Sequence, residues 1–272
     1  MVVAPEFPRE LADGIWWLGG CNETENFGTK LHVHTSPYLI VGTERAVLYD
    51  TGLPLHLESL LAQLDSILGQ RPVDWFIPSH PEIAHSGSLQ MIAERYADMV
   101  IGGDLRDYHL LYPDLTERFE TMRPGHELDL GGGYRTVLLP ALVKDLTNTV
   151  WAYERSQQVL FPSDGFAYTH HPPRETEDGD DLVYHLPGEC ALTSTELGAT
   201  PSIDQAAFIT KAALYWTKYV WFEPFFARVD ELLDQFPAKI IAPAHGNPIT
   251  DVAAIMPVIK EAHRQVYAPS AS

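Results

Sequence analysis

Cysteine is scarce in this chain, since Cys21 and Cys190 are the only two among 272 residues. Neither belongs to a Cys-X-X-Cys pair, so the sequence offers no disulfide framework and no spacing typical of a zinc–thiolate cage. We therefore expect both cysteines to be free thiols.

Basic residues are also few, with 18 Lys and Arg against 37 Asp and Glu and a formal net charge of −19. Such a charge repels phosphate backbones and anionic lipids, and no local basic patch overrides it. Long apolar runs are missing as well: none approaches the ~18 residues of a membrane span, and the N-terminus lacks the pattern of a signal peptide. We therefore expect a cytoplasmic protein that binds neither nucleic acid nor membrane.

Hydrophobic residues make up 45% of the chain, which is enough for a sizeable core. The length favours one large α/β domain over residues 1–272. Alternating and apolar runs predict strands, and apolar residues three or four apart predict helices. The predicted strands cover 14–18, 30–34, 38–41, 46–49, 73–77, 99–101, 135–139, 150–153, 159–161 and 239–242, and the main helices 54–68, 89–96 and 203–236, the last broken at Pro224.

Potential metal ligands follow three of the predicted strands. His80, Glu82 and His85 come directly after the run VDWFIP, Asp164 follows VLFPS, and His245 follows IIAPA. On an extended or turning backbone, positions i and i+2 project to the same side, so His80 and Glu82 can reach one ion while His85 serves its neighbour. We expect these five side chains to converge on a metal centre.

At these residues the sequence resembles the metallo-β-lactamase superfamily, and most closely the metal domain of flavodiiron proteins with its HxExDH motif. The resemblance extends over roughly residues 14–250. It is carried by YLIVGTERAVLYDTG, SHPEIAHSGSL, QQVLFPSDGF, KYVWFEPFFARVDELLD and KIIAPAHG. It implies an αββα four-layer sandwich with a dinuclear metal site at one edge, between two sheets. The flavodoxin domain of those proteins is not expected within this chain.

Two departures from the family motif weaken the expected site. Ala84 stands where the motif has an Asp, so one carboxylate of the second metal is missing. The middle His of the family is also missing. Counting back from Asp164 without a gap places Asp145 there as a substitute ligand, whereas an insertion of two residues would place Val143 there.

The remaining residues divide into two sets of ligands. The first metal would take His80, Glu82, Asp164 and, in the register without a gap, Asp145; the second would take His85, His245 and the shared Asp164. Two His and one carboxylate suit iron with open positions, although zinc also accepts them. We expect iron, in a mononuclear or dinuclear site, with Asp145 and Asp164 serving in catalysis as well.

Other side chains near these motifs have less specific roles. His32 and His34 alternate on one strand, so they share a face that either borders the site or is structural. His170 and His171 follow Asp164 and either reach the pocket mouth or belong to a solvated loop. The aromatic residues between positions 215 and 226 are expected to pack in the core, cover an oligomer face or line a substrate pocket.

Three functions are compatible with this pattern. The missing ligands favour a metal-dependent hydrolase, in which a metal-bound hydroxide attacks a small, neutral molecule such as an activated aromatic ether or ester. The alternative is a diiron protein that binds oxygen, or reduces oxygen or nitric oxide, with electrons from a separate donor. The third is a degenerate subunit of a heteromeric enzyme. The resemblance also implies a homodimer or a heterodimer with a related subunit.

Overall fold

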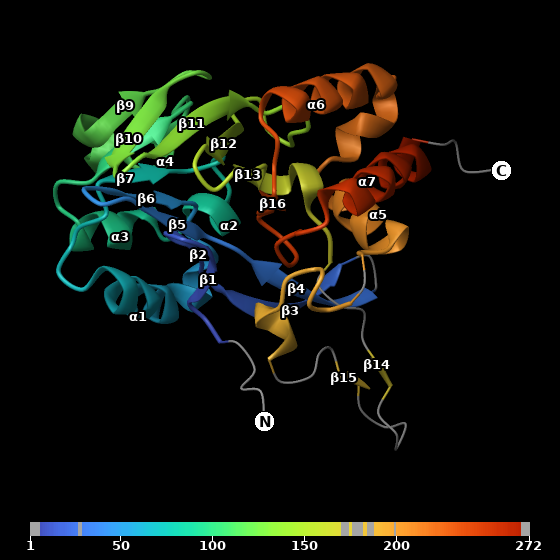
Figure 1. The fold of residues 1–272 in the computed structure, drawn as a ribbon, viewed down its shortest axis with the longest axis horizontal. Helices are drawn as coiled ribbons and strands as arrows, with labels where there is room; N and C mark the ends of the chain where they lie inside the picture. Colours follow the sequence, from blue (N-terminus) through green and yellow to red (C-terminus); the bar gives the residue numbers. More distant parts are fainter. Residues whose placement is uncertain are drawn as a thin grey trace.

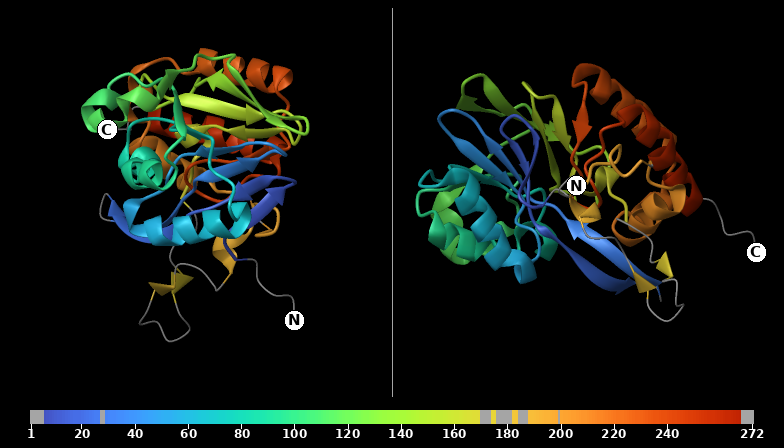
Figure 2. Two further views of the ribbon diagram at one scale, coloured as in Figure 1. Left: turned by 90° about the vertical axis from the view of Figure 1, so that its left-hand side faces the viewer. Right: turned by 60° about the horizontal axis from the view of Figure 1, so that its bottom comes forward.

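Two β-sheets pack face to face in the middle of the molecule, and helices cover the outer face of each sheet (Figures 1 and 2). The computed structural model describes residues 6–26, 29–169, 174–175, 182–183, 188–198 and 200–267. The αββα four-layer sandwich predicted from the sequence is confirmed. None of the helices in these ranges is long and apolar enough to cross a membrane.

The first sheet has seven strands, antiparallel at one end and parallel at the other. Their order is β1 (Arg9–Ala12), β2 (Ile15–Trp17), β5 (Tyr38–Val41), β6 (Ala46–Tyr49), β7 (Trp75–Ile77), β8 (Val100–Gly103) and β9 (Phe119–Thr121). Gly42 begins the turn between β5 and β6, where a Cβ would lie 2.2 Å from the Leu130 carbonyl oxygen. Glycine is therefore required where this turn meets the second sheet.

The second sheet has five strands. Neighbouring strands pair antiparallel except the last two, which pair in parallel. Their order is β10 (Glu127–Gly131), β11 (Tyr134–Pro140), β12 (Val150–Glu154), β13 (Val159–Phe161) and β16 (Ile240–Ile241). Two separate hairpins pair β3 (Gly20–Asn26) with β4 (Thr29–Thr35), and β14 (Arg174–Glu175) with β15 (Leu182–Val183).

Helices of the first half of the chain cover the first sheet, namely α1 (Leu57–Leu68), α3 (Leu89–Arg95) and α4 (Tyr108–Leu111), while the short α2 (Ile83–Ser86) precedes α3. In α1, Leu60, Leu64 and Leu68 are buried on one face, as their spacing of four predicts. Each buried leucine contributes about 1.5–3 kcal/mol relative to an exposed one. The helix ends at Gly69, whose φ of 61° is typical of glycine after a helix.

Helices of the second half cover the second sheet, namely α5 (Ile203–Ala212), α6 (Glu223–Gln235) and α7 (Val252–Tyr267). The single predicted helix over 203–236 is wrong in detail, because a 3-10 turn, η5 (Tyr215–Tyr219), separates α5 from α6. Pro224 lies in the first turn of α6 and starts that helix, since its missing N–H is unpaired there anyway.

The inner faces of the sheets meet in an aromatic core. Tyr38 and Phe161 lie 5.3 Å apart between ring centroids, and Tyr49 donates hydrogen bonds to the carbonyls of Val150 (2.8 Å) and Phe161 (3.2 Å). Tyr49 therefore joins β6 of one sheet to β12 and β13 of the other. This linkage fixes the strand ends that carry the candidate site.

Candidate metal centre

Strands from both sheets end at the same edge of the sandwich. β6 and β7 pair in parallel, β13 and β16 pair in parallel, and β11 runs the same way as β13 because both are antiparallel to β12. Polar side chains follow each carboxyl end: Asp50 after β6, Ser79 and His80 after β7, Asp145 after β11, Asp164 after β13 and His245 after β16. The topology thus brings together residues up to 195 positions apart, from Asp50 to His245.

The first group of candidate ligands surrounds the His80 ring. Its Nε2 lies 3.1 Å from Asp145 Oδ2, 3.8 Å from Glu82 Oε2 and 3.8 Å from Asp164 Oδ2. One ligand atom each from His80, Glu82 and Asp145 lies within 4.8 Å of the other two. Glu82 is half-exposed at 52%, whereas the His80 and Asp145 side chains are buried. This group is therefore a pocket of carboxylates around one imidazole, open to solvent at Glu82.

The second group surrounds Asp164, which is 3% exposed. Its Oδ2 lies 3.7 Å from His85 Nε2, and its Oδ1 lies 3.6 Å from His245 Nε2. Because Oδ2 is also the oxygen that faces His80, Asp164 stands between the two groups. The His80 and His85 rings are 3.8 Å apart between centroids. Asp164 therefore faces members of both groups, while the division of these residues between two metals stays a prediction.

Polar partners orient each histidine from behind. Asp50 accepts hydrogen bonds from the Ser79 backbone N–H (2.6 Å), from the Ser79 hydroxyl (2.9 Å) and from His85 Nδ1 (2.8 Å). His80 Nδ1 contacts the hydroxyls of Ser79 (3.2 Å) and Ser163 (3.1 Å). In both rings Nδ1 is thus engaged on the far side, and Nε2 faces the candidate metal positions.

His245 is held by a different element. Its Nδ1 lies 3.1 Å from the His34 carbonyl oxygen, and an isolated bridge pairs His245 with Thr35 at the end of β4. The β3–β4 hairpin therefore positions the last candidate ligand.

Charge in the site follows from burial and close carboxylates. Burial alone lowers the pKa of His80, but the carboxylates of Asp145, Glu82 and Asp164 outweigh it and raise that pKa to about 10. Burial, reinforced by the charge of His80, lowers the pKa of His85 to about 3. Burial also raises the pKa of Asp50 to about 7. Without a metal, one proton on His80 supplies the positive charge that these carboxylates require.

The residues present fit a metal cation. His85 Nε2 and Asp164 Oδ1 are buried and have no hydrogen-bond partner within the described residues, whereas His80 Nε2 faces Asp145 Oδ2 at 3.1 Å. Burying atoms without a partner costs free energy, and a cation between His85 and Asp164 would satisfy both. Two imidazoles and one carboxylate form a ligand set that iron accepts, with coordination positions left open.

The sequence-derived candidates differ in where the structure places them. Asp145 lies beside His80, which is the position given by the register without a gap, while Val143 is buried in the apolar core under the second sheet. Ala84 lies on α2, so no carboxylate comes from the position before His85. The assignment of these residues as ligands stays a prediction.

The secondary candidates do not join the two groups. His34 is buried against Trp17 and Phe7 and contacts the Ser36 hydroxyl, so its side chain has structural neighbours. His32 is buried on the same hairpin. His170 and His171 lie outside the described residues.

The aromatic series divides between core and surface. Phe222 and Phe226 are buried under the second sheet, whereas Tyr215, Tyr219 and Trp221 are 57–74% exposed. A role of the exposed rings in pairing two chains stays a prediction.

Asp50, Ser79 and Ser163 are functional candidates that sequence reasoning missed. Asp50 and Ser163 have positive φ values of 63° and 53°, which are uncommon for residues other than glycine and cluster at functional sites. Each follows directly after a strand or one residue later, so the strand-end argument that found Asp164 could also have found them.

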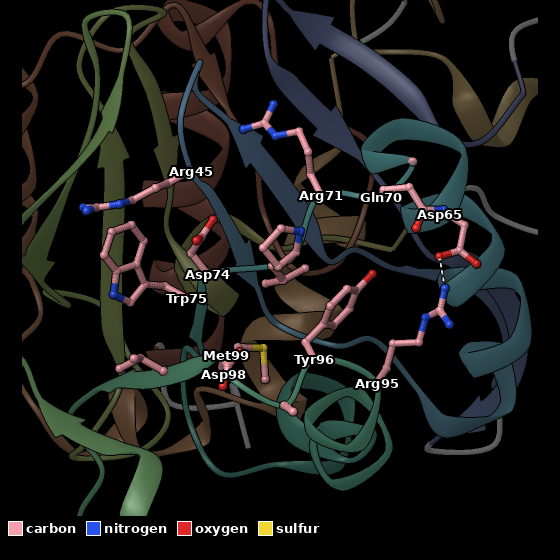
Figure 3. A pocket seen from close by; sticks show the side chains of 15 residues that line it. Arg45, Asp65, Gln70, Arg71, Asp74, Trp75, Arg95, Tyr96, Asp98 and Met99 are labelled. Carbon is pink, nitrogen blue, oxygen red and sulfur yellow. Dashed lines mark hydrogen bonds and ion pairs between the residues drawn. The ribbon is translucent and has the colours of Figure 1, made fainter.

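A separate hollow of about 570 Å³ lies away from this centre (Figure 3). It is lined by Arg45, Arg71, Trp75, Arg95 and Tyr96, with Asp65 and Asp74 among the other lining residues. Trp75 is the first residue of β7, so the hollow lies at the opposite end of that strand from His80. None of its lining residues belongs to either ligand group, and we assign the chemistry to the metal centre.

Comparison with known proteins places the chain among metallo-β-lactamase folds. Residues 32–187 match the family model described as the metallo-beta-lactamase superfamily. The coenzyme F420H2 oxidase of Methanothermobacter marburgensis is 29% identical over 172 residues, 58% of this chain and 41% of that protein. The anaerobic nitric oxide reductase flavorubredoxin of Vibrio vulnificus is 23% identical over 247 residues, 85% of this chain and 43% of that protein. The chain spans less than half the length of these curated relatives.

Solved structures show the same fold. Rubredoxin oxygen:oxidoreductase from Desulfovibrio gigas aligns with 95% of this chain and 60% of its own, at a TM-score of 0.69 and 15% identity. The flavodiiron protein of Giardia intestinalis aligns with 96% of this chain and 60% of its own, at a TM-score of 0.70 and 17% identity.

The prediction of a hydrolase is wrong. It rested on the missing ligands, yet the curated relatives carry the names of an oxidase and a reductase, and Asp145 supplies a carboxylate beside His80. The resemblance to flavodiiron metal domains is confirmed by the structural neighbours. By the match over residues 32–187 and by its fold, the chain belongs to the metallo-β-lactamase superfamily.

Proposed function

We propose that this chain binds non-haem iron in its two ligand groups and, when supplied with electrons, reduces dioxygen or nitric oxide. The observation that carries the proposal is the position of Asp164, whose two oxygens face His80 and His85 on one side and His245 on the other. A carboxylate between two groups of ligands is suited to bridge two cations. The curated relatives named as an oxidase and a nitric oxide reductase support this assignment.

Iron is favoured over zinc by the chemistry of the donors. The groups contain imidazole and carboxylate but no thiolate, and the second group, with His85, His245 and Asp164, offers only three ligand side chains. Such open positions on a two-His, one-carboxylate set are typical of iron sites that bind small molecules. When bound, the iron would supply the site that takes up dioxygen or nitric oxide and the capacity to pass electrons.

The protein's own groups orient the ligands and exclude water. Asp50 accepts a hydrogen bond from the Nδ1–H of His85, so the Nε2 lone pair faces inward. The hydroxyls of Ser79 and Ser163 contact Nδ1 of His80, so its Nε2 faces inward as well. These two hydroxyls are 2.9 Å apart. His80 and His85 are 0–1% exposed, so these two side chains are fixed before any ion binds.

Protons and electrons must reach the site from outside. Reducing dioxygen to water consumes both, and nitric oxide reduction does as well. Glu82 is the half-exposed member of the first group, so it connects the buried carboxylates with solvent and can transfer protons. We assign the electrons to a flavin-type redox donor, in keeping with the name flavorubredoxin of one relative.

The test uses protein produced with iron and purified without oxygen. Iron per chain is measured by elemental analysis, and consumption of dioxygen and of nitric oxide is then followed with a chemically reduced flavin as donor. We expect iron to be present and consumption to depend on both iron and donor.

Variants link that activity to the centre. His80→Ala and His245→Ala should lose iron and consumption while keeping the fold. Asp74→Asn is the matched control. Asp74 directly precedes β7, at the end of that strand away from the centre, and accepts a hydrogen bond from the Ala46 N–H. Iron-loaded protein that consumes neither gas, or consumes it equally after His80→Ala, would overturn the proposal.

A further inference from the structure

The two cysteines, 169 positions apart in the sequence, meet at a second cluster of potential metal ligands. Cys21 lies on β3, His32 on β4, and Cys190 on the short 3-10 turn η4 (Glu189–Ala191). One ligand atom each from Cys21, His32 and Cys190 lies within 4.8 Å of the other two. Both cysteines are free thiols, as expected from the sequence, but the structure places them close together.

The register of the β3–β4 hairpin explains two of the three positions. Cys21 pairs with His34, and Glu23 pairs with His32. Paired residues of antiparallel strands share a face, as do positions two apart, so Cys21 and His32 are diagonal neighbours on one face of the hairpin. Diagonal neighbours are close enough for their side-chain ends to meet a common atom.

Two tethers hold the third position against the hairpin. Asn247 donates a hydrogen bond to the Leu192 carbonyl (2.7 Å), and the Arg9 guanidinium bonds the Ala191 carbonyl and pairs with Glu196 (2.6 Å). Asn247 is two residues after His245, which itself contacts the His34 carbonyl. The segment that carries Cys190 is thus fixed directly after the cysteine.

We propose that Cys21, His32 and Cys190 form a second metal site that binds Zn²⁺, separate from the centre around Asp164. Two thiolates and an imidazole are the ligands that zinc prefers in proteins, whereas carboxylates dominate the first centre. The fourth position of a tetrahedral ion would be open to water. Both cysteines are only half-buried, so an ion can enter, and His32 is buried behind them.

Binding at this site replaces protons by the cation. The ligand atoms of Cys21 and Cys190 lie within 4.8 Å of each other, so one ion can reach both sulfurs. Zn²⁺ would release the thiol protons to solvent, with no oxidation and no further reactant. The bound ion would link η4, which carries Cys190, to the hairpin formed by β3 and β4.

A disulfide between Cys21 and Cys190 is the competing use of the same thiols. It would consume both sulfurs, require an oxidant and leave the imidazole of His32 without a part in the cluster. The convergence of a nitrogen ligand with both sulfurs therefore favours a metal.

The test titrates Co²⁺, a spectroscopic substitute for zinc, into reduced, metal-free protein without oxygen. Thiolate ligands give cobalt a charge-transfer absorption that imidazole and carboxylate ligands do not give. We expect this band to reach a plateau that corresponds to one thiolate-bound Co²⁺ per chain and to disappear on adding Zn²⁺. It should be lost in Cys21→Ser and in Cys190→Ser but retained in His80→Ala, which affects only the first centre.

Three results would overturn the proposal. These are a titration without a thiolate band, a band that persists in both serine variants, or a Cys21–Cys190 disulfide in protein purified without oxygen. Thermal unfolding gives an independent measurement, because Zn²⁺ should raise the Tm of His80→Ala but not of the His80→Ala, Cys190→Ser double variant. None of these outcomes depends on whether the first centre holds iron.

Discussion

Replacing Asp50 by asparagine should reverse the tautomer of His85 and weaken metal binding without removing any candidate ligand. Asp50 Oδ2 lies 2.8 Å from His85 Nδ1 and also accepts from the Ser79 hydroxyl, while Oδ1 accepts from the Ser79 N–H at 2.6 Å. Asparagine keeps one acceptor oxygen, which the Ser79 N–H occupies. Its amide nitrogen then faces His85 Nδ1, and two donors would oppose each other unless the His85 proton moves to Nε2.

The magnitude follows from the hydrogen bond that is lost. A hydrogen bond to a charged group contributes about 1.5–3 kcal/mol, and each 1.4 kcal/mol corresponds to about tenfold in affinity. We therefore expect the affinity of the second group, with His85, Asp164 and His245, to fall by about 10–100-fold. This agrees with the usual effect of removing the partner behind a metal-bound histidine.

The assay is competition between metal-free protein and a chromophoric chelator for Fe²⁺, without oxygen and at about pH 8. Burial raises the pKa of Asp50 to about 7, so at about pH 8 the group is still mostly a carboxylate. Asp74→Asn serves as the control, since it replaces a carboxylate that accepts a backbone N–H away from the centre. Equal affinity of the wild type and Asp50→Asn would refute the assignment of Asp50 as the residue that orients His85.

Three further predictions concern the ions and the core. Ala84→Asp should raise the iron retained per chain after dialysis, because it restores a carboxylate next to His85; a wild type that already holds two tightly bound ions would contradict it. Removing iron with a chelator should lower Tm yet leave the circular dichroism spectrum intact, since the cores of both sheets form without the ion. Burial lowers the pKa of His263 from 6.5 to about 4. Between these pH values the unfolded chain binds more protons than the folded chain. The contribution of neutral His263 to the free energy of unfolding is therefore full above pH 6.5 and is lost as the pH falls towards 4. Relative to His263→Phe, the wild type should therefore lose about 2 kcal/mol of unfolding free energy between about pH 7 and pH 5, measured by urea denaturation; the same pH dependence in both proteins would contradict this.

The sandwich was predictable because its central strands and helices carry strong periodic patterns. Strands β5, β6 and β13 were placed at their observed bounds, and α1 showed both its apolar face and its terminal glycine. The helix α7 was not predicted, although its apolar residues are spaced for a helix, because Pro257 interrupts the expected pattern. Strand β3 was missed because its residues, GCNETEN, are polar and pair within a hairpin away from the core.

The candidate site was predictable where polar residues follow apolar strands. That rule found His80, Asp164 and His245, while Asp145 depended on the choice of register, because it lies five residues beyond the end of β11. The cluster at Cys21 could not be found in this way. Its members come from a polar hairpin and a 3-10 turn, and only tertiary packing brings them together.

The two ligand groups of the first centre are unequal in charge, and this asymmetry bears on where a gas molecule would bind. The first group combines His80 with the carboxylates of Glu82, Asp145 and Asp164, which bring three negative charges close to one imidazole. The second has only Asp164 with two imidazoles, because Ala84 adds none. A cation is held more strongly by more carboxylates, whereas fewer ligands leave more positions open. Under the proposed function, iron would therefore fill the first group before the second, and a gas molecule would bind at the second.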